Sequence, residues 1–213
     1  MEIHKMSEFK IKHYKNVIWD FDGVILDSNE IRKKGFRFIF KDFKEDKVKL
    51  LLQYHFENGG LSRYVKIRHF YENILGRSIT ESQVNKHAED FSRIMLEHLA
   101  DKALVISDSY YFIKKYYKDY NFHIASGSDE NELRILCKKL ELSKYFLSIK
   151  GSPTPKINLV REIIRNNSYR INETCLIGDS VNDYEAATHS GISFIGYNNR
   201  SLTSYGTYVT SFS

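Results

Sequence analysis

From residue 101 to residue 196 the sequence alternates between amphipathic helical segments and short apolar runs. This alternation is typical of a parallel α/β sheet, because a parallel strand needs a crossover, usually a helix, before the next strand can pair with it. The expected helices span residues 109–120, 130–140, 156–166 and 181–189, and the expected strands span residues 122–126, 145–149, 173–177, 192–195 and 207–210. Loops of such a sheet gather at the carboxyl ends of its strands, where ligands bind.

A first strand is expected at residues 16–21, where the apolar run NVIWDF leads into a turn at Gly23. About seventy residues of mostly helical periodicity separate this run from the alternating region. The helical segments lie around residues 31–56, 62–75 and 81–99. The simplest fold is an α/β, Rossmann-like parallel-sheet core with a helical cap inserted after its first strand. The core is expected to comprise residues 1–28 and 101–213, and the cap residues 29–100.

The composition excludes several classes of protein. The chain has 213 residues, of which 42% are hydrophobic and 28% are charged, so it is neither disordered nor collagen-like. Its two cysteines, Cys137 and Cys175, are too few for a disulfide framework and lack the spacing of zinc ligands. Residues 1–15 are charged throughout, and no later apolar run approaches the roughly 18 residues of a membrane span. We therefore expect a soluble, cytoplasmic protein that does not bind membranes.

The net charge of +5 is matched by a single segment, residues 31–50, which holds eight basic and three acidic residues. Such a segment can attract an anionic partner, but it more often forms a solvated helix face. Tyrosines and lysines interleave at residues 110–120, a pattern on which nucleic-acid bases can stack. An amphipathic helix that covers the sheet with Phe112 and Ile113 uses the same residues. We favour the helix and expect no nucleic-acid partner.

Two carboxylates follow the first expected strand. Asp20 and Asp22 would share one face of an extended strand, but a turn at Gly23 lets one point forward as a nucleophile while the other swings round as an acid. An Asx-turn with a purely structural role is the alternative.

A second acidic loop, GDSVND at residues 178–183, follows another expected strand. It places Asp179 and Asp183 at helix-turn spacing, and oxygen ligands of this kind suit a hard cation such as Mg²⁺. Capping of the following helix by Asp179 or Ser180 is the alternative, and it is compatible with metal binding.

Two weaker signals lie between the acidic loops. Ser126, Gly127 and Ser128 stand at a strand-to-helix junction, where backbone N–H groups can hold a phosphate, although a simple turn looks the same. Lys156 follows a loop stiffened by two prolines, which would present one ammonium group to the pocket. The alternative is that Lys156, like most lysines at the start of a helix, is simply solvated.

In this order at successive strand ends, the four signals resemble the four motifs of the haloacid dehalogenase superfamily. The motifs read DFDGVILDS, IASGS, Lys156 after its proline-containing loop, and CLIGDSVNDYEAA. The resemblance covers about residues 14–28 and 101–196. The helical stretch between the first two motifs resembles the small cap of the branch that contains phosphoglycolate phosphatase and β-phosphoglucomutase.

The resemblance implies a role for each matching residue. Asp20 would attack phosphorus to give an aspartyl-phosphate, and Asp22 would act as general acid and then general base, with its pKa raised toward neutrality. Lys156 would balance the charge of nucleophile and phosphate. The implied phosphoryl-binding residues are Gly23, Ser126 and Gly127. Mg²⁺ would be held by Asp20, Asp179 and the backbone carbonyl of Asp22, with support from Asp183.

The cap is expected to set specificity. Arg63 and Lys66 lie three residues apart after a Gly pair and suit an anionic or hydroxyl-rich leaving group, although two solvated bases on a capped helix are an equal alternative. The run Gly-Leu-Ser-Arg resembles the element with which β-phosphoglucomutase grips the second phosphate of its substrate. However, Arg32 stands where that mutase has a helpful histidine, which argues against mutase activity.

The sequence thus predicts a Mg²⁺-dependent hydrolase that acts on a small, sugar-like phosphomonoester, with a phosphorylated metabolite as its partner. A sugar phosphomutase is the first alternative, and a bisphosphate-primed assay would identify it. A non-catalytic regulatory protein on the same fold is the second, but an idle site has no chemical need for all four of Asp20, Asp22, Lys156 and Asp179.

Overall fold

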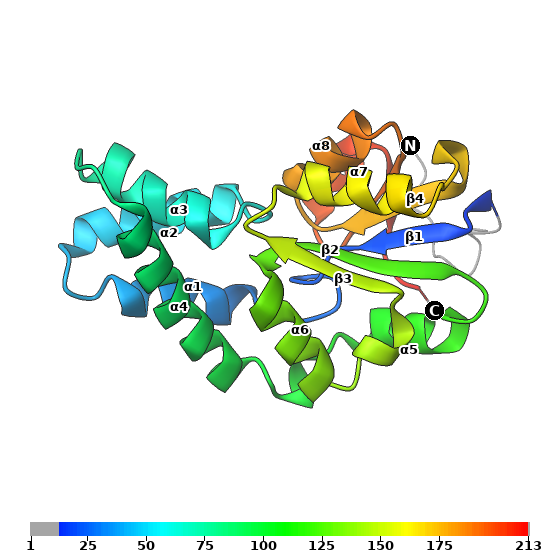
Figure 1. The fold of residues 1–213 in the computed structure, drawn as a ribbon, viewed down its shortest axis with the longest axis horizontal. Coiled ribbons are helices and arrows are strands. Elements are labelled where there is room, and N and C mark those ends of the chain that lie inside the picture. Colours follow the sequence, from blue (N-terminus) through cyan, green and yellow to red (C-terminus); the bar gives the residue numbers. More distant parts are fainter. Residues whose placement is uncertain (1–12, 213) are drawn as a thin grey trace.

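The computed structural model describes residues 13–212. Its core is a six-stranded sheet of order β3-β2-β1-β4-β5-β6, in which every paired strand is parallel to its neighbour (Figure 1). The strands are β1 (Asn16–Trp19), β2 (Asn121–Asp129), β3 (Ser148–Ser152), β4 (Thr174–Gly178), β5 (Ser193–Tyr197) and β6 (Thr207–Val209). The predicted parallel α/β core with a helical insertion after its first strand is confirmed. The N-terminal residues 1–12 of the expected core, and most of the charged segment 1–15, lie outside the described residues.

Helices cover both faces of the sheet (Figure 1). The core helices are α5 (Ser107–Tyr116), α6 (Glu130–Lys139), α7 (Lys156–Asn166) and α8 (Val181–His189). Alternate side chains of β1 show the two layers, because Val17 and Trp19 pack with Phe112 of α5, whereas Ile18 packs with Leu159 of α7. The central strands β1 and β4 are buried along their whole length, as strands covered on both faces must be.

The cap consists of α1 (Asn29–Ile39), α2 (Glu45–Glu57), α3 (Arg63–His69) with a π-helical turn (Phe70–Ile74), and α4 (Glu81–His98). It lies beyond the carboxyl ends of the strands (Figure 1). The expectation of one helical segment at residues 31–56 is wrong, because the chain turns between α1 and α2. This turn lets Phe40 and Phe43 both pack against Phe70, with ring centroids 4.3 and 5.1 Å away.

Within the basic segment most charged side chains are exposed, but Arg32 is buried. Phe112 and Ile113 of α5 are buried against the sheet, as the amphipathic pattern predicted. Cys137 and Cys175 are both buried and free. Of the helices between residues 13 and 212, none is long and apolar enough to cross a membrane.

Candidate active site

Asp20 lies at the carboxyl end of β1, in the centre of the sheet. Its backbone N–H donates to the carbonyl of Ile177 on β4 at 2.9 Å, which continues the strand pairing to the point where the two strands separate. The side chain is buried, with 5% of its surface exposed. The parallel order of β1 and β4 therefore brings the first acidic loop beside the second.

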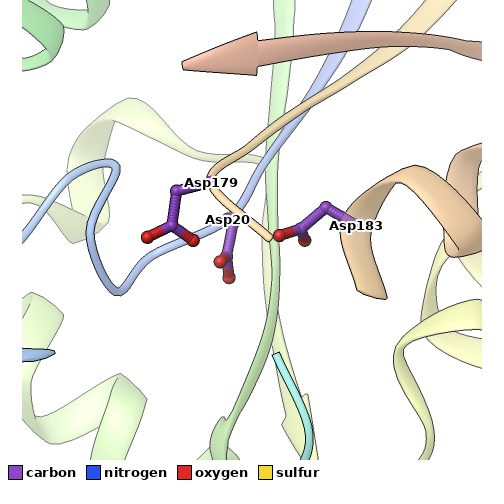
Figure 2. A group of neighbouring side chains, drawn as sticks. All are labelled: Asp20, Asp179 and Asp183. Carbon is purple, nitrogen blue, oxygen red and sulfur yellow. The ribbon is translucent and has the colours of Figure 1, made fainter. Parts of the chain in front are cut away.

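Three carboxylates meet at this point, those of Asp20, Asp179 and Asp183 (Figure 2). One carboxylate oxygen from each lies within 4.8 Å of the others. Lys156, the first residue of α7, contacts two of them, with its Nζ 2.9 Å from Asp20 Oδ1 and 2.5 Å from Asp183 Oδ1. Three acidic groups thus share one ammonium group.

The pKa values follow this shortage of positive charge. Burial, reinforced by the charge of Asp183, raises the pKa of Asp20 well above its ordinary value, although Lys156 opposes the shift. The same two causes raise the pKa of Asp179 to about 7. Burial alone would lower the pKa of Lys156, but Asp183 and Asp20 raise it, so that its ammonium group stays charged. A divalent cation among these oxygens would remove the repulsion, and oxygen-only donors suit a hard cation.

Asp183 also has a structural task. Its Oδ2 accepts hydrogen bonds from the backbone N–H of Ser180 at 3.1 Å and from the Ser180 hydroxyl at 2.5 Å, which closes a capping box at the start of α8. Its Oδ1 faces Lys156. With both oxygens engaged in this way, Asp183 fixes Lys156 and α8 beside the other two carboxylates.

Asp22 points to a different set of partners. Ser28 Oγ and Arg32 Nε donate to its Oδ1 at 2.5 and 2.6 Å, and Ser128 Oγ donates to its Oδ2 at 2.5 Å. Burial alone would raise the pKa of this carboxyl, but Arg32 and the two hydroxyls outweigh it and hold the pKa below its ordinary value. The raised pKa that Asp22 would need in the closed site stays a prediction. In the site without substrate Arg32 lowers this pKa, and nothing in the sequence indicates that Arg32 reaches Asp22.

Gly23 begins the turn that directly follows Asp20 and Asp22. Its φ of +74° is in the left-handed region, and a Cβ there would lie 2.0 Å from Asp179 Oδ2. Two asparagines after β5 hold this turn and the loop of Asp179, since Asn198 Nδ2 donates to the Gly23 carbonyl at 2.9 Å and Asn199 Nδ2 donates to the Asp179 carbonyl at 2.8 Å. Sequence reasoning missed both asparagines, because NN after a strand reads as an ordinary turn.

The Ser126-Gly127-Ser128 loop lies at the end of β2. Ser126 Oγ accepts from the backbone N–H of Ser128 at 3.1 Å and is buried in the loop. Gly127 lies directly under the cap, because a Cβ there would be 2.3 Å from the carbonyl oxygen of Gly60. This loop therefore borders both the carboxylates of the core and the cap.

Core and cap enclose a pocket of about 550 Å³. The core supplies its floor and the cap supplies its roof. Its lining includes Asp20, Asp22, Ser126, Gly127 and Asp179 from the core, and Arg32, His55, Gly60, Arg63 and Lys66 from the cap. The expected nucleophile, acid, phosphate-binding loop and cap residues thus meet in one cavity, with Lys156 bound to Asp20 beneath it.

Arg63 and Lys66 are buried rather than solvated. Lys66 Nζ lies 2.9 Å from His55 Nδ1 and donates to the Gly59 carbonyl at 3.2 Å. Burial, reinforced by Arg32, lowers the pKa of Lys66 to about 7, and burial with the charge of Lys66 lowers the pKa of His55 to about 3. His55 is therefore neutral at pH 7 and can accept the hydrogen bond. The alternative of two solvated bases is wrong.

The cap is closed onto the core at its Gly pair. A Cβ at Gly60 would lie 2.7 Å from both Asn182 Cβ and Ser180 Oγ of the core, whereas a Cβ at Gly59 would make only an ordinary contact of 3.8 Å. We expect Gly60→Ala to lower kcat/KM by about tenfold or more by holding the cap open, with little change in the melting temperature. Gly59→Ala is the matched control, and equal losses in both variants would contradict a closure contact at Gly60.

The sequence of residues 17–197 matches a family described as haloacid dehalogenase-like hydrolase. A search of curated proteins finds no match.

Solved structures with the same fold are similar over nearly the whole chain. A β-phosphoglucomutase from Clostridium difficile is 16% identical with a TM-score of 0.72, over 93% of this chain and 92% of that one. A predicted phosphoglycolate phosphatase from Haemophilus somnus is 13% identical with a TM-score of 0.71, over 94% and 95% of the two chains. CbbY from Rhodobacter sphaeroides, in complex with xylulose-(1,5)bisphosphate, is 14% identical with a TM-score of 0.73, over 93% and 95%.

Proposed function

The chain belongs to the haloacid dehalogenase-like hydrolase family, and from this premise we propose that it hydrolyses a small, sugar-like phosphomonoester through an aspartyl-phosphate on Asp20. The observation that carries the proposal is the position of Asp20. Its buried carboxylate lies at the floor of the pocket between core and cap, 2.9 Å from the Lys156 ammonium and within the same acidic group as Asp179. The family assignment confirms the resemblance predicted from the four motifs.

Asp20 has one oxygen available for attack. Lys156 holds Oδ1, so Oδ2 is the oxygen that would form the bond to phosphorus as the ester bond to the leaving alcohol breaks. Lys156, the Ser126 hydroxyl and the Gly127 amide would carry the charge of the phosphoryl oxygens. Mg²⁺, held by Asp20, Asp179 and the backbone carbonyl of Asp22 with support from Asp183, would neutralise the charge that develops on the transferred phosphoryl group.

Asp22 would donate a proton to the leaving alcohol and later accept one from water. In the site without substrate its carboxylate is ionised, because Arg32 and the hydroxyls of Ser28 and Ser128 stabilise the charged form. A bound phosphoryl group adds a negative charge beside it, which raises its pKa and favours the protonated acid needed by the leaving oxygen. After the alcohol leaves, the same carboxylate would accept a proton from the water that attacks the aspartyl-phosphate.

The test is phosphate release from sugar phosphates and other small phosphomonoesters, measured with Mg²⁺ and with a chelator. We expect release from at least one member with Mg²⁺, and loss of at least about a hundredfold with chelator, because the ion would be held by Asp20 and Asp179 beside the attacking carboxylate. Release that is unaffected by the chelator would contradict the metal requirement. If no member releases phosphate, and a bisphosphate instead primes isomerisation, the chain is a mutase and the hydrolytic proposal fails.

A further inference from the structure

A buried carboxylate from the core neutralises the cap arginines. Glu132, in the first turn of α6, contacts Arg32 Nη1 through Oε1 at 3.0 Å and Arg63 Nη1 through Oε2 at 2.6 Å. The Glu132 side chain is fully buried, and the two arginine side chains are 7% and 3% exposed. Both arginines line the pocket above the carboxylates of Asp20 and Asp22.

The charges of this region nearly cancel before any substrate enters. Arg32 faces both Asp22 and Glu132, and Arg63 faces Glu132, so two guanidinium groups meet two carboxylates. Lys66 adds only part of a charge, since its pKa is about 7, and His55 adds none. A leaving group with its own negative charge would therefore find no spare arginine charge, and it would approach the fully buried Glu132 carboxylate, which solvent screens little.

The arginines still have hydrogen bonds to offer. Arg32 Nη2 and Arg63 Nη2 are buried, and neither has a hydrogen-bond partner among residues 13–212. A buried donor without a partner is costly, so a ligand that supplies an acceptor is favoured. Hydroxyl oxygens accept such bonds without adding charge, and Ser92 already shows the pairing, since its hydroxyl accepts from Arg63 Nη1 at 2.6 Å.

We propose that Glu132 is a specificity-determining residue that selects phosphomonoesters with an uncharged, polyhydroxylated leaving group over those that carry a carboxylate or a second phosphate there. This inference rests on the proposed function and deepens it. Sequence reasoning left anionic and hydroxyl-rich leaving groups equally open at Arg63 and Lys66. The contact of Glu132 with both arginines favours the hydroxyl-rich group.

The test compares substrates that differ only at the end distant from the phosphate. Glucitol 6-phosphate and 6-phosphogluconate differ by a CH₂OH in place of a carboxylate, as do glycerol 3-phosphate and 3-phosphoglycerate. We expect the parent protein to have kcat/KM at least about tenfold higher for the alcohol of each pair, because like charges in a closed pocket repel. In Glu132→Gln, this ratio should fall by about tenfold or more, through a lower KM for the acid and a higher KM for the alcohol.

Two further variants separate selectivity from structure. Glu132→Asp keeps the charge with a shorter side chain, so we expect it to keep the preference for the alcohol even if kcat falls. Glu89→Gln makes the same change of charge at an exposed position of α4 and should leave the ratio unchanged. Melting temperatures show whether each variant is folded.

Three outcomes overturn the inference. The first is a parent protein that prefers the acid of each pair. The second is an equal loss of activity on both members in Glu132→Gln and Glu132→Asp, since Glu132 would then only hold the cap in place. Both results leave the hydrolase proposal standing. Release from no phosphomonoester at all would instead remove the proposed function together with this inference.

Discussion

Asp20→Asn is expected to lower kcat for phosphate release by at least about a thousandfold, because an amide cannot form the phosphoryl-enzyme. The variant keeps the size and burial of the side chain, so substrate binding should change far less than kcat. Phosphate release under single-turnover conditions measures the loss. Near-normal turnover in Asp20→Asn would contradict a covalent intermediate on this residue.

The same substitution should stabilise the metal-free fold. Burial and the charge of Asp183 raise the pKa of Asp20 in the folded state, so the folded chain binds a proton there that the unfolded chain releases above the ordinary pKa of 3.8. The stability that this protonation contributes is present below that pKa and is lost as pH rises towards the folded value. Asparagine removes the repulsion, so its advantage in melting temperature, measured in chelator, should grow from pH 4 to pH 8.

If the melting temperature of Asp20→Asn is equal to or lower than that of the parent protein across this range, the proposed repulsion among the three carboxylates is contradicted. Added Mg²⁺ provides the control. It should raise the melting temperature of the parent protein more than that of the variant, since a bound cation neutralises the carboxylates that destabilise the metal-free site. Activity and stability are therefore opposed at Asp20, as is common where function requires buried like charges.

Much of the core of the site could be predicted because its signals are local. α7 and α8 begin and end at the predicted residues, Lys156–Asn166 and Val181–His189, since a proline precedes the first and a Ser180–Asp183 capping box starts the second. In a parallel sheet the loop after each strand must lie at the same edge, so Asp20 and Asp179 meet once β1 and β4 pair.

The cap could not be predicted to the same depth, because its contacts join residues far apart in the chain. Glu132 contacts Arg32 across 100 residues and Arg63 across 69. In the sequence Glu132 is an ordinary acidic residue in the first turn of a helix, and Arg32 is one of eight bases in a charged segment. Only the folded chain, in which Arg32 of α1 and Arg63 of α3 reach Glu132 of α6, shows that these charges are buried together and that Arg32 lowers the pKa of Asp22.

Lys156→Met is expected to damage both activity and stability, in contrast to Asp20→Asn. The Lys156 ammonium contacts two of the three carboxylates, those of Asp20 and Asp183, and the Lys156 side chain is 2% exposed. Removing one partner of a buried ion pair typically costs about 3–5 kcal/mol of unfolding free energy, because the remaining charge loses its compensation. We expect a loss of that size in chelator by urea denaturation, and a loss of kcat of at least about a hundredfold.

The Asp20→Asn/Lys156→Met double variant tests whether the two substitutions affect stability through the same group of interacting charges. With Asp20 already neutralised by substitution, Lys156 has fewer charges to balance, so Lys156→Met should cost less stability in the Asp20→Asn background than in the parent protein. Lys150→Met is the matched control, since Lys150 pairs with Glu162 in a partly exposed ion pair outside the site and such pairs contribute about 1 kcal/mol or less. Equal costs for Lys156→Met in both backgrounds would mean that Lys156 acts through packing alone. A smaller cost in the Asp20→Asn background would instead show that the Lys156 ammonium has two effects. It would assist the attack by Asp20, and it would offset the cost of burying the Asp20 carboxylate.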